Sequence, residues 1–252
     1  MWRRLALCSL LLLAAPASLP AAPAQGSRAG VEELIATLDG ASDPLTRAEA
    51  AEDLGRLERA EAPVAAALID ALALDPDYPV RGRAAEALGR LGPVSGEVVP
   101  ALSEALEWDT HLMVRWRTAE ALERIGRQHP DVAEPVVPAL IAALQGDPYP
   151  GVRARAAKAL GGIGLMRAGV LPALLLAFNR DSHAGVRWQA AAALEGVAVR
   201  HRDAGAAESL GQLKDALAAL EGHPHPDIQR NAAGLRHVIR QLEARSGPAD
   251  SQ

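Results

Sequence analysis

Hydrophobic residues recur along most of the chain at intervals of three and four positions, which is the spacing of one face of an α-helix. Leu68 and Leu72 belong to one such stripe, and Val80, Ala84 and Leu88 form the next one, with polar residues between them. Glycines follow the second kind of stripe, where they are typical helix ends. The pattern therefore predicts pairs of short helices, each pair joined by a tight turn.

This pair of stripes returns with a period of about 34 residues. The segment Val-Arg-Gly-Arg-Ala-Ala-Glu-Ala-Leu starts at Val80, and similar segments start at Thr46, Val114, Val152 and Val186, with a degenerate one at Ile228. The second residue of the five better copies is an arginine, at Arg47, Arg81, Arg115, Arg153 and Arg187, so the steps are 34, 34, 38 and 34 residues. The longer step reflects an insertion around residues 128–131, between two repeats.

A single helical pair of this kind cannot shield its own hydrophobic faces from water, whereas stacked pairs shield one another. We therefore expect one all-α domain over residues 31–245, an α-α superhelix (solenoid) of five to six helical hairpins. Residues 25–30 read as a linker before it, and residues 246–252 as a disordered tail after it.

The repeated pattern Asp-x-x-x-x-Val-Arg-x-x-Ala-Ala-x-Ala-Leu-Gly resembles the HEAT repeat, in the short bacterial form also found in phycobilin lyase subunits. The aspartates that carry it are Asp75, Asp109, Asp147 and Asp181. The resemblance covers roughly residues 31–240 and implies a superhelix of five to six HEAT-like hairpins whose second helices line a concave face. It implies binding more often than catalysis. Lyase activity is an analogy within the same family, and no particular partner carries over.

The first 24 residues have the pattern of a secretory signal peptide. Arg3 and Arg4 precede a short apolar stretch, and Ala22-Pro23-Ala24 forms a small-residue cleavage site, with a cut after Ala17 as the alternative. We therefore expect a periplasmic or secreted protein without stable membrane insertion, the alternative being that the segment stays as an uncleaved anchor. Cys8, the single cysteine, lies inside this leader, so the mature chain has no thiol chemistry.

Charge excludes one large class of partner. Removal of the leader takes away Arg3 and Arg4 and no acidic residue, which leaves 24 Lys and Arg against 31 Asp and Glu, a net charge of about −7. Non-specific binding to nucleic acid or to an anionic membrane needs an excess of positive charge instead. The recurring Asp and Arg residues are interpreted as structural, with Asp capping the second helix and Arg bridging to the Asp of its own or the adjacent repeat.

Residues that break the repeat are the better candidates for a binding surface. The position after the repeat arginine holds Trp116 and Trp188, and it points about 165° away from the buried stripe. The next position supplies Arg83, Arg117 and Arg155. Exposed Trp and Arg are enriched at interface hot spots, so these five residues are the predicted binding residues. The alternative is that the tryptophans fill gaps between repeats and the arginines pair with Glu86 and Glu120.

Candidate chemistry is sparse. His183, His223 and His225, with Asp181 and Asp227 nearby, raise the alternative of a metal-binding rim, although His-Pro-His-Pro is also a rigid turn. No phosphate-cradling glycine loop, Gly-x-Ser-x-Gly elbow or His-Glu-x-x-His motif occurs. We therefore expect no catalytic residues, no metal and no cofactor.

The sequence as a whole predicts an exported interaction module or scaffold that holds a protein or peptide on its concave face. Two alternatives come from other classes: a lyase-type enzyme or enzyme subunit built on such repeats, and a metal-linked accessory protein.

Overall fold

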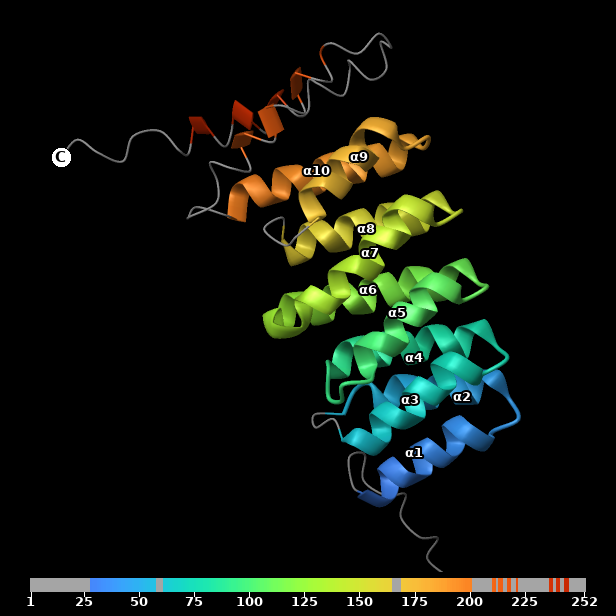
Figure 1. The fold of residues 1–252 in the computed structure, drawn as a ribbon. Helices are drawn as coiled ribbons and strands as arrows, with labels where there is room; N and C mark the ends of the chain where they lie inside the picture. Colours follow the sequence, from blue (N-terminus) through green and yellow to red (C-terminus); the bar gives the residue numbers. More distant parts are fainter. Residues whose placement is uncertain are drawn as a thin grey trace, which may run out of the picture.

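The computed structural model describes residues 28–57, 61–164 and 169–200, together with separate positions between 210 and 244. Within these ranges the chain forms ten α-helices and one short 3-10 helix, and no strand. The helices are arranged as antiparallel pairs stacked one on the next (Figure 1). The predicted all-α solenoid is therefore confirmed, whereas the expected leader, residues 1–24, and tail, residues 246–252, lie outside the described residues.

Each hairpin contributes one helix to each of two rows. The row of first helices contains α1 (Arg28–Gly40), α3 (Ala62–Leu74), α5 (Val98–Trp108), α7 (Ala133–Gly146) and α9 (Val170–Arg180). The row of second helices contains α2 (Pro44–Leu54), α4 (Tyr78–Leu91), α6 (Leu112–Gln128), α8 (Pro150–Ile163) and α10 (Ala184–Arg200).

Two boundaries differ from a strict repeat. The helix α1 begins inside the segment 25–30 that was expected to be a linker, and an exposed ion pair between Arg28 and Glu32 spans its first turn. The long repeat step ends in η1 (Pro130–Val132), a 3-10 turn between α6 and α7 that takes up the insertion expected around residues 128–131.

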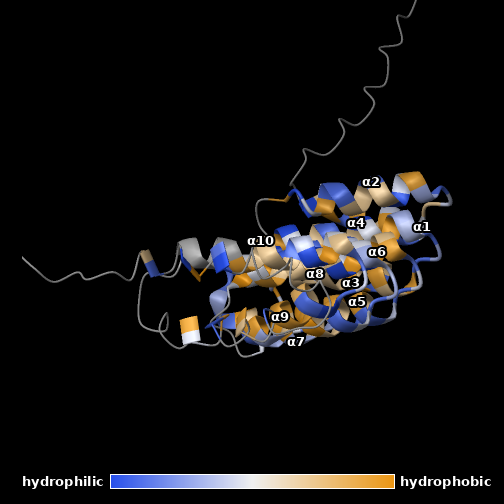
Figure 2. Ribbon diagram, turned by 90° about the horizontal axis from the view of Figure 1, so that it is seen from above, coloured by the Kyte–Doolittle hydropathy of each residue, from blue (hydrophilic) through white to orange (hydrophobic). Residues whose placement is uncertain are grey.

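The hydrophobic core lies between the two rows and runs continuously through the stack. Leucines from both rows, such as Leu68, Leu88 and Leu102, are completely buried. Figure 2 looks along the stack and shows the two rows as two layers. Each buried leucine stabilises the fold by about 1.5–3 kcal/mol relative to an exposed one. Because adjacent hairpins bury one another's leucines, a single hairpin would lose this stabilisation. No helix among the described residues is long and apolar enough to cross a membrane.

The second helices approach one another more closely than the first helices do. Gly55, Gly89 and Gly161 each stand eight residues after the repeat arginine, and each lies against an alanine of the next repeat. A Cβ added at Gly89 would lie only 2.6 Å from the Cβ of Ala121, which shows how closely α4 and α6 pack. The second helices therefore form the more closely packed of the two rows.

The repeat arginines lock each hairpin to the next one. Each guanidinium makes a two-pronged contact with the aspartate of the following repeat, in the pairs Arg47–Asp75, Arg81–Asp109, Arg115–Asp147 and Arg153–Asp181. In the third pair, Nε of Arg115 lies 2.6 Å from Oδ2 of Asp147, and Nη2 lies 3.1 Å from Oδ1. The expected bridge to the adjacent repeat is confirmed, and these four pairs are called the buried ladder.

The aspartates of the buried ladder do not cap the second helices as expected. Asp75, Asp109, Asp147 and Asp181 instead end the first helices. Their side chains accept a hydrogen bond from the backbone N–H two residues further on, as Asp109 does from His111. The reason is distance along the chain, because each aspartate stands three residues before the first residue of the second helix, so another residue occupies the N-cap position directly before that helix.

The buried ladder also shifts the pKa values of its members. Hydrogen bonding to Asp109 raises the pKa of Arg81, and Asp147 does the same for Arg115, in both cases against the opposing effect of burial. For Asp181, burial raises the pKa of the carboxyl, but hydrogen bonds from Arg153 and from the backbone outweigh it, so the pKa lies below its ordinary value. These pKa shifts favour the charged forms of Arg81, Arg115 and Asp181.

Candidate functional site

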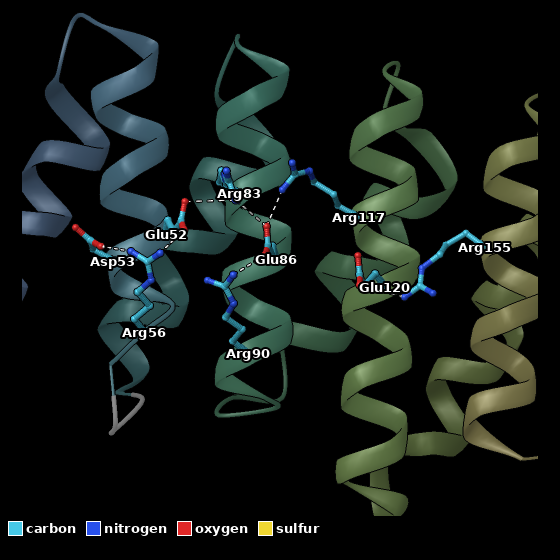
Figure 3. Close-up of polar contacts among 9 residues, drawn as sticks. All are labelled: Glu52, Asp53, Arg56, Arg83, Glu86, Arg90, Arg117, Glu120 and Arg155. Atoms are coloured by element: carbon cyan, nitrogen blue, oxygen red, sulfur yellow. Dashed lines mark hydrogen bonds and ion pairs between the residues drawn. The ribbon is translucent and has the colours of Figure 1, made fainter.

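The solvent-facing side of the second helices carries a second set of ion pairs. Here an arginine two positions after the repeat arginine reaches back to a glutamate of the preceding repeat (Figure 3). The pairs are Arg83–Glu52 at 3.3 Å, Arg117–Glu86 at 2.6 Å and Arg155–Glu120 at 3.5 Å. We call this solvent-facing side of α2, α4, α6, α8 and α10 the inner face, and these three pairs the surface ladder.

The two ladders differ in their exposure to water. Side chains of the buried ladder are at most 13% exposed, whereas Arg83 is 36% exposed and Glu120 is 41% exposed. Exposed ion pairs contribute about 0–1 kcal/mol each, because water and salt screen them. The Arg83–Glu52 and Arg117–Glu86 pairs therefore add little to stability and remain available to a partner, whereas Arg155 of the third pair is only 6% exposed.

The two predicted tryptophans lie in different surroundings. Trp188 on α10 is 69% exposed, as expected for a residue on the open side of its helix. Trp116 on α6 is half-buried and packs against the core cluster, and the guanidinium carbon of Arg155 lies 5.4 Å from its ring centroid. The neighbouring repeat thus covers Trp116, so of the two only Trp188 presents most of its side chain to solvent.

The three predicted arginines also differ. Arg83 and Arg117 are half-buried and share the carboxylate of Glu86. Arg155 is 93% buried, with its guanidinium between Trp116 and Glu123. It therefore lies deeper than the solvent-facing position that the sequence suggested. The cause is the stacking of repeats, because Arg155 lies over Trp116 and Arg117 lies against Gly82, which are the residues that follow the repeat arginine in the preceding repeat.

A cleft of about 490 Å³ opens between α6 and α8 on the inner face. Its lining is almost entirely charged and consists of Glu120, Glu123, Arg124, Arg127, Gln128, Arg155 and Lys158. Four of these residues are basic and two are acidic, so the cleft is locally positive although the whole chain has a net charge of −5. We call it the basic cleft.

The basic cleft coincides with three departures from the repeat. Glu123 occupies the position at which Gly55, Gly89 and Gly161 stand in other repeats. Gly162 replaces an arginine, and a Cβ there would lie only 2.6 Å from a carboxylate oxygen of Glu123, so the glycine leaves room for that side chain.

The third departure is Lys158, which stands where the surface ladder has a glutamate. Its side chain is exposed, and no ion pair to another described residue is formed. Neither Lys158 nor Arg124 was among the binding residues predicted from the sequence. An alignment of the repeats could have indicated Lys158, because it occupies the position that holds Glu52, Glu86 and Glu120 in the preceding repeats.

The inter-helix turns hold the histidines. The ring of His111 stacks on Tyr78 with centroids 3.6 Å apart, and its Nδ1 accepts a hydrogen bond from the N–H of Met113. His183 accepts a similar bond from the N–H of Gly185. Among the described residues no group of three or more potential ligands surrounds a metal position, and His223 and His225 lie outside them.

The stacked hairpins and the charged inner face define an α-solenoid of the HEAT and armadillo kind, a fold that commonly mediates protein–protein interaction and is typical of non-enzymatic scaffolds. A family model of HEAT repeats matches residues 65–137, 100–195 and 137–235, which together make up more than half of the chain. The chain belongs to the HEAT-repeat family.

Solved structures support the same fold. An engineered protein is 22% identical, with a TM-score of 0.51 over 84% of this chain and 97% of its own. A designed armadillo repeat protein in complex with the peptide (KR)4 is 20% identical, with a TM-score of 0.51 over 83% and 99%. A chain of the Kap95:Nup1 complex is 16% identical, with a TM-score of 0.58 over 92% of this chain but 32% of that one. No curated protein is significantly similar in sequence.

Proposed function

We propose that this protein is an interaction module that holds a protein or peptide segment on its inner face. The observation that carries the proposal is the surface ladder, a row of arginine and glutamate side chains whose Arg83–Glu52 and Arg117–Glu86 pairs are partly exposed and contribute little to the stability of the fold. A preformed row of helices loses little conformational entropy when a partner binds. Trp188 adds an exposed aromatic anchor at the end of the described row.

A crosslinking pair tests which face binds. Trp188 on α10 and Trp108 on α5 are both tryptophans and are 69% and 71% exposed, but they belong to the inner and outer rows respectively. Replacement of each in turn by the photo-crosslinking residue benzoylphenylalanine, in the native host, is expected to give a discrete adduct from position 188 and none from position 108. Equal labelling from both positions, or labelling from position 108 alone, would contradict binding on the inner face.

The proposed function includes export of the protein from the cytoplasm. The basic start, the short apolar stretch and the Ala22-Pro23-Ala24 site support secretion to the periplasm or beyond. Mass spectrometry of the protein isolated from its host is expected to find Gln25 as the first residue, or Ser18 if cleavage follows Ala17. An intact Met1 in the main species would contradict a cleaved leader. The likeness to phycobilin lyase subunits stays a prediction, and no described contact favours it over the binding role.

A further inference from the structure

The basic cleft between α6 and α8 has features of a ligand site that the rest of the inner face lacks. Its volume of about 490 Å³ falls within the usual range of ligand pockets, about 300–1,000 Å³. The surface ladder elsewhere pairs each arginine with a glutamate, whereas here the four basic residues outnumber the two acidic ones. This excess of positive charge favours the binding of an anionic group from outside the chain.

One side chain of the cleft is buried with unused hydrogen-bonding capacity. Arg155 is only 6% exposed in its side chain, and its Nε atom has no hydrogen-bond partner. An arginine offers five N–H donors, and a buried donor without a partner destabilises the protein because it has lost its hydrogen bond to water. Its Nη2 atom lies 2.8 Å from Glu123 but 3.5 Å from Glu120, so the second contact is loose.

The guanidinium of Arg155 is also held in place before any partner arrives. Trp116 lies on one side of it at 5.4 Å, and the 10% exposed Glu123 anchors one end. Glu120 is the more exposed partner, with 41% of its side chain exposed against 10% for Glu123. An incoming carboxylate can therefore displace Glu120 while Arg155 keeps its orientation.

Two further cations lie at the mouth of the cleft. Arg124 and Lys158 form no ion pair with any other described residue, and both line the cleft. Lys158 is exposed on α8, one turn from Arg155, and Arg124 is half-buried on α6. Cations from two helices thus surround the same opening, which suits an acidic side chain reaching in from a segment that lies across the inner face.

We infer that the basic cleft binds an acidic peptide segment, with the peptide carboxylates held by Lys158, Arg124 and Arg155 in place of Glu120. A peptide is favoured over a small free anion because the cleft is open along the inner face and two of its cations are not enclosed. This inference rests on the proposed function and adds the chemistry of the bound segment to it.

Fluorescence anisotropy with a fluorescein-labelled, C-terminally amidated peptide of alternating Glu and Ala tests the inference. The Glu peptide is expected to bind at least about tenfold more tightly than the matching Gln peptide, and its affinity is expected to fall as salt rises. Equal binding of the two peptides would overturn the inference. Competition by glutarate or inorganic phosphate at the affinity of the peptide would overturn the choice of a peptide as the occupant.

Charge-reversal variants locate the binding. Lys158→Glu is expected to weaken binding of the Glu peptide by about tenfold or more, because it replaces attraction by repulsion. Arg180→Glu makes the same change in net charge at an exposed position at the end of α9, outside the cleft, and is expected to change binding less than about threefold. Equal effects of the two variants would mean that only the overall charge matters and would overturn the assignment to the cleft.

A gain-of-function variant separates binding from folding. Glu120→Gln removes the carboxylate that competes for Arg155 and is expected to tighten binding of the Glu peptide by about threefold or more. A variant that merely damaged the fold would not strengthen binding. If Glu120→Gln weakens peptide binding, the inference is wrong. If the Glu peptide fails to bind at all while position 188 still gives its crosslink, the inference fails and the proposed function stands.

Discussion

Removal of one arginine from the buried ladder is expected to destabilise the whole stack. Arg115 is 6% exposed and Asp147 is 8% exposed, and the two share a two-pronged contact. The Arg115→Ala variant leaves the carboxylate of Asp147 buried without its cation, and it also removes the hydrogen bond at 2.7 Å to the backbone carbonyl of Asp109. Loss of one partner from a buried pair typically costs about 3–5 kcal/mol.

The surface ladder supplies the matched control. Arg83→Ala removes an arginine from a second helix one repeat earlier, but the side chain of Arg83 is 36% exposed in both of its ion pairs. The expected loss is about 0–1 kcal/mol, because solvent replaces the lost contact. Arg115 and Arg83 occupy repeat positions that differ by two residues. Their removal is therefore expected to lower the free energy of unfolding by amounts that differ several-fold.

Urea and thermal unfolding followed by far-UV circular dichroism measure the difference. At about 2–4 °C per kcal/mol for a chain of this size, Arg115→Ala is expected to lower Tm by about 6–20 °C. An unchanged m value shows that the same transition is compared in each variant. The double variant Arg115→Met/Asp147→Leu, which leaves no buried charge, is expected to recover a large part of the loss. A loss below about 1 kcal/mol for Arg115→Ala, equal to that of Arg83→Ala, would refute the assignment of stacking to the buried ladder.

Three further variants test packing, exposure and pH dependence. Gly89→Ala is expected to destabilise by about 1–3 kcal/mol because its Cβ would lie 2.6 Å from the next repeat, whereas Gly151→Ala in α8, with nothing within 4 Å, is expected to be neutral or stabilising in the same urea titration. Trp116→Ala is expected to lower Tm by more than Trp188→Ala does, since only the former packs against the core cluster; the reverse order would contradict the placement of both rings. Asp181→Asn is expected to lower the urea midpoint at neutral pH. Because the folded pKa of Asp181 lies below its ordinary 3.8, its contribution is present above that value and is lost as pH falls through the folded pKa, so the two midpoints are expected to converge in acid.

The fold was predictable because its information is local and repeated. Stripes at helical spacing predict each helix, and the period predicts the stacking. A bridge from Arg81 to an aspartate of its own or the adjacent repeat was also predictable, and the structure shows that it goes to the next repeat. The burial of Arg155 did not follow, because it depends on how far one repeat leans over the previous one. A helical wheel places Trp116 on the open side of its own helix and contains no information about the neighbouring helix that covers it.

Several departures from the repeat are separated in the sequence but meet in space. The insertion that ends in η1 follows α6, Glu123 lies on α6, and Gly162 and Lys158 lie on α8, so all of them belong to a single junction of the stack. A junction that served only to stack hairpins would be built like its neighbours, with glycine against alanine and the ladder intact. Here Glu123, a buried carboxylate, stands where other repeats have a glycine. Gly162 stands where the first three repeats have an arginine and makes room for Glu123, and Lys158 stands where the surface ladder has a glutamate. Glu123 and Lys158 place charged side chains in the same opening and Gly162 makes room for one of them, and therefore the basic cleft is the part of the inner face whose chemistry the scaffold alone does not explain.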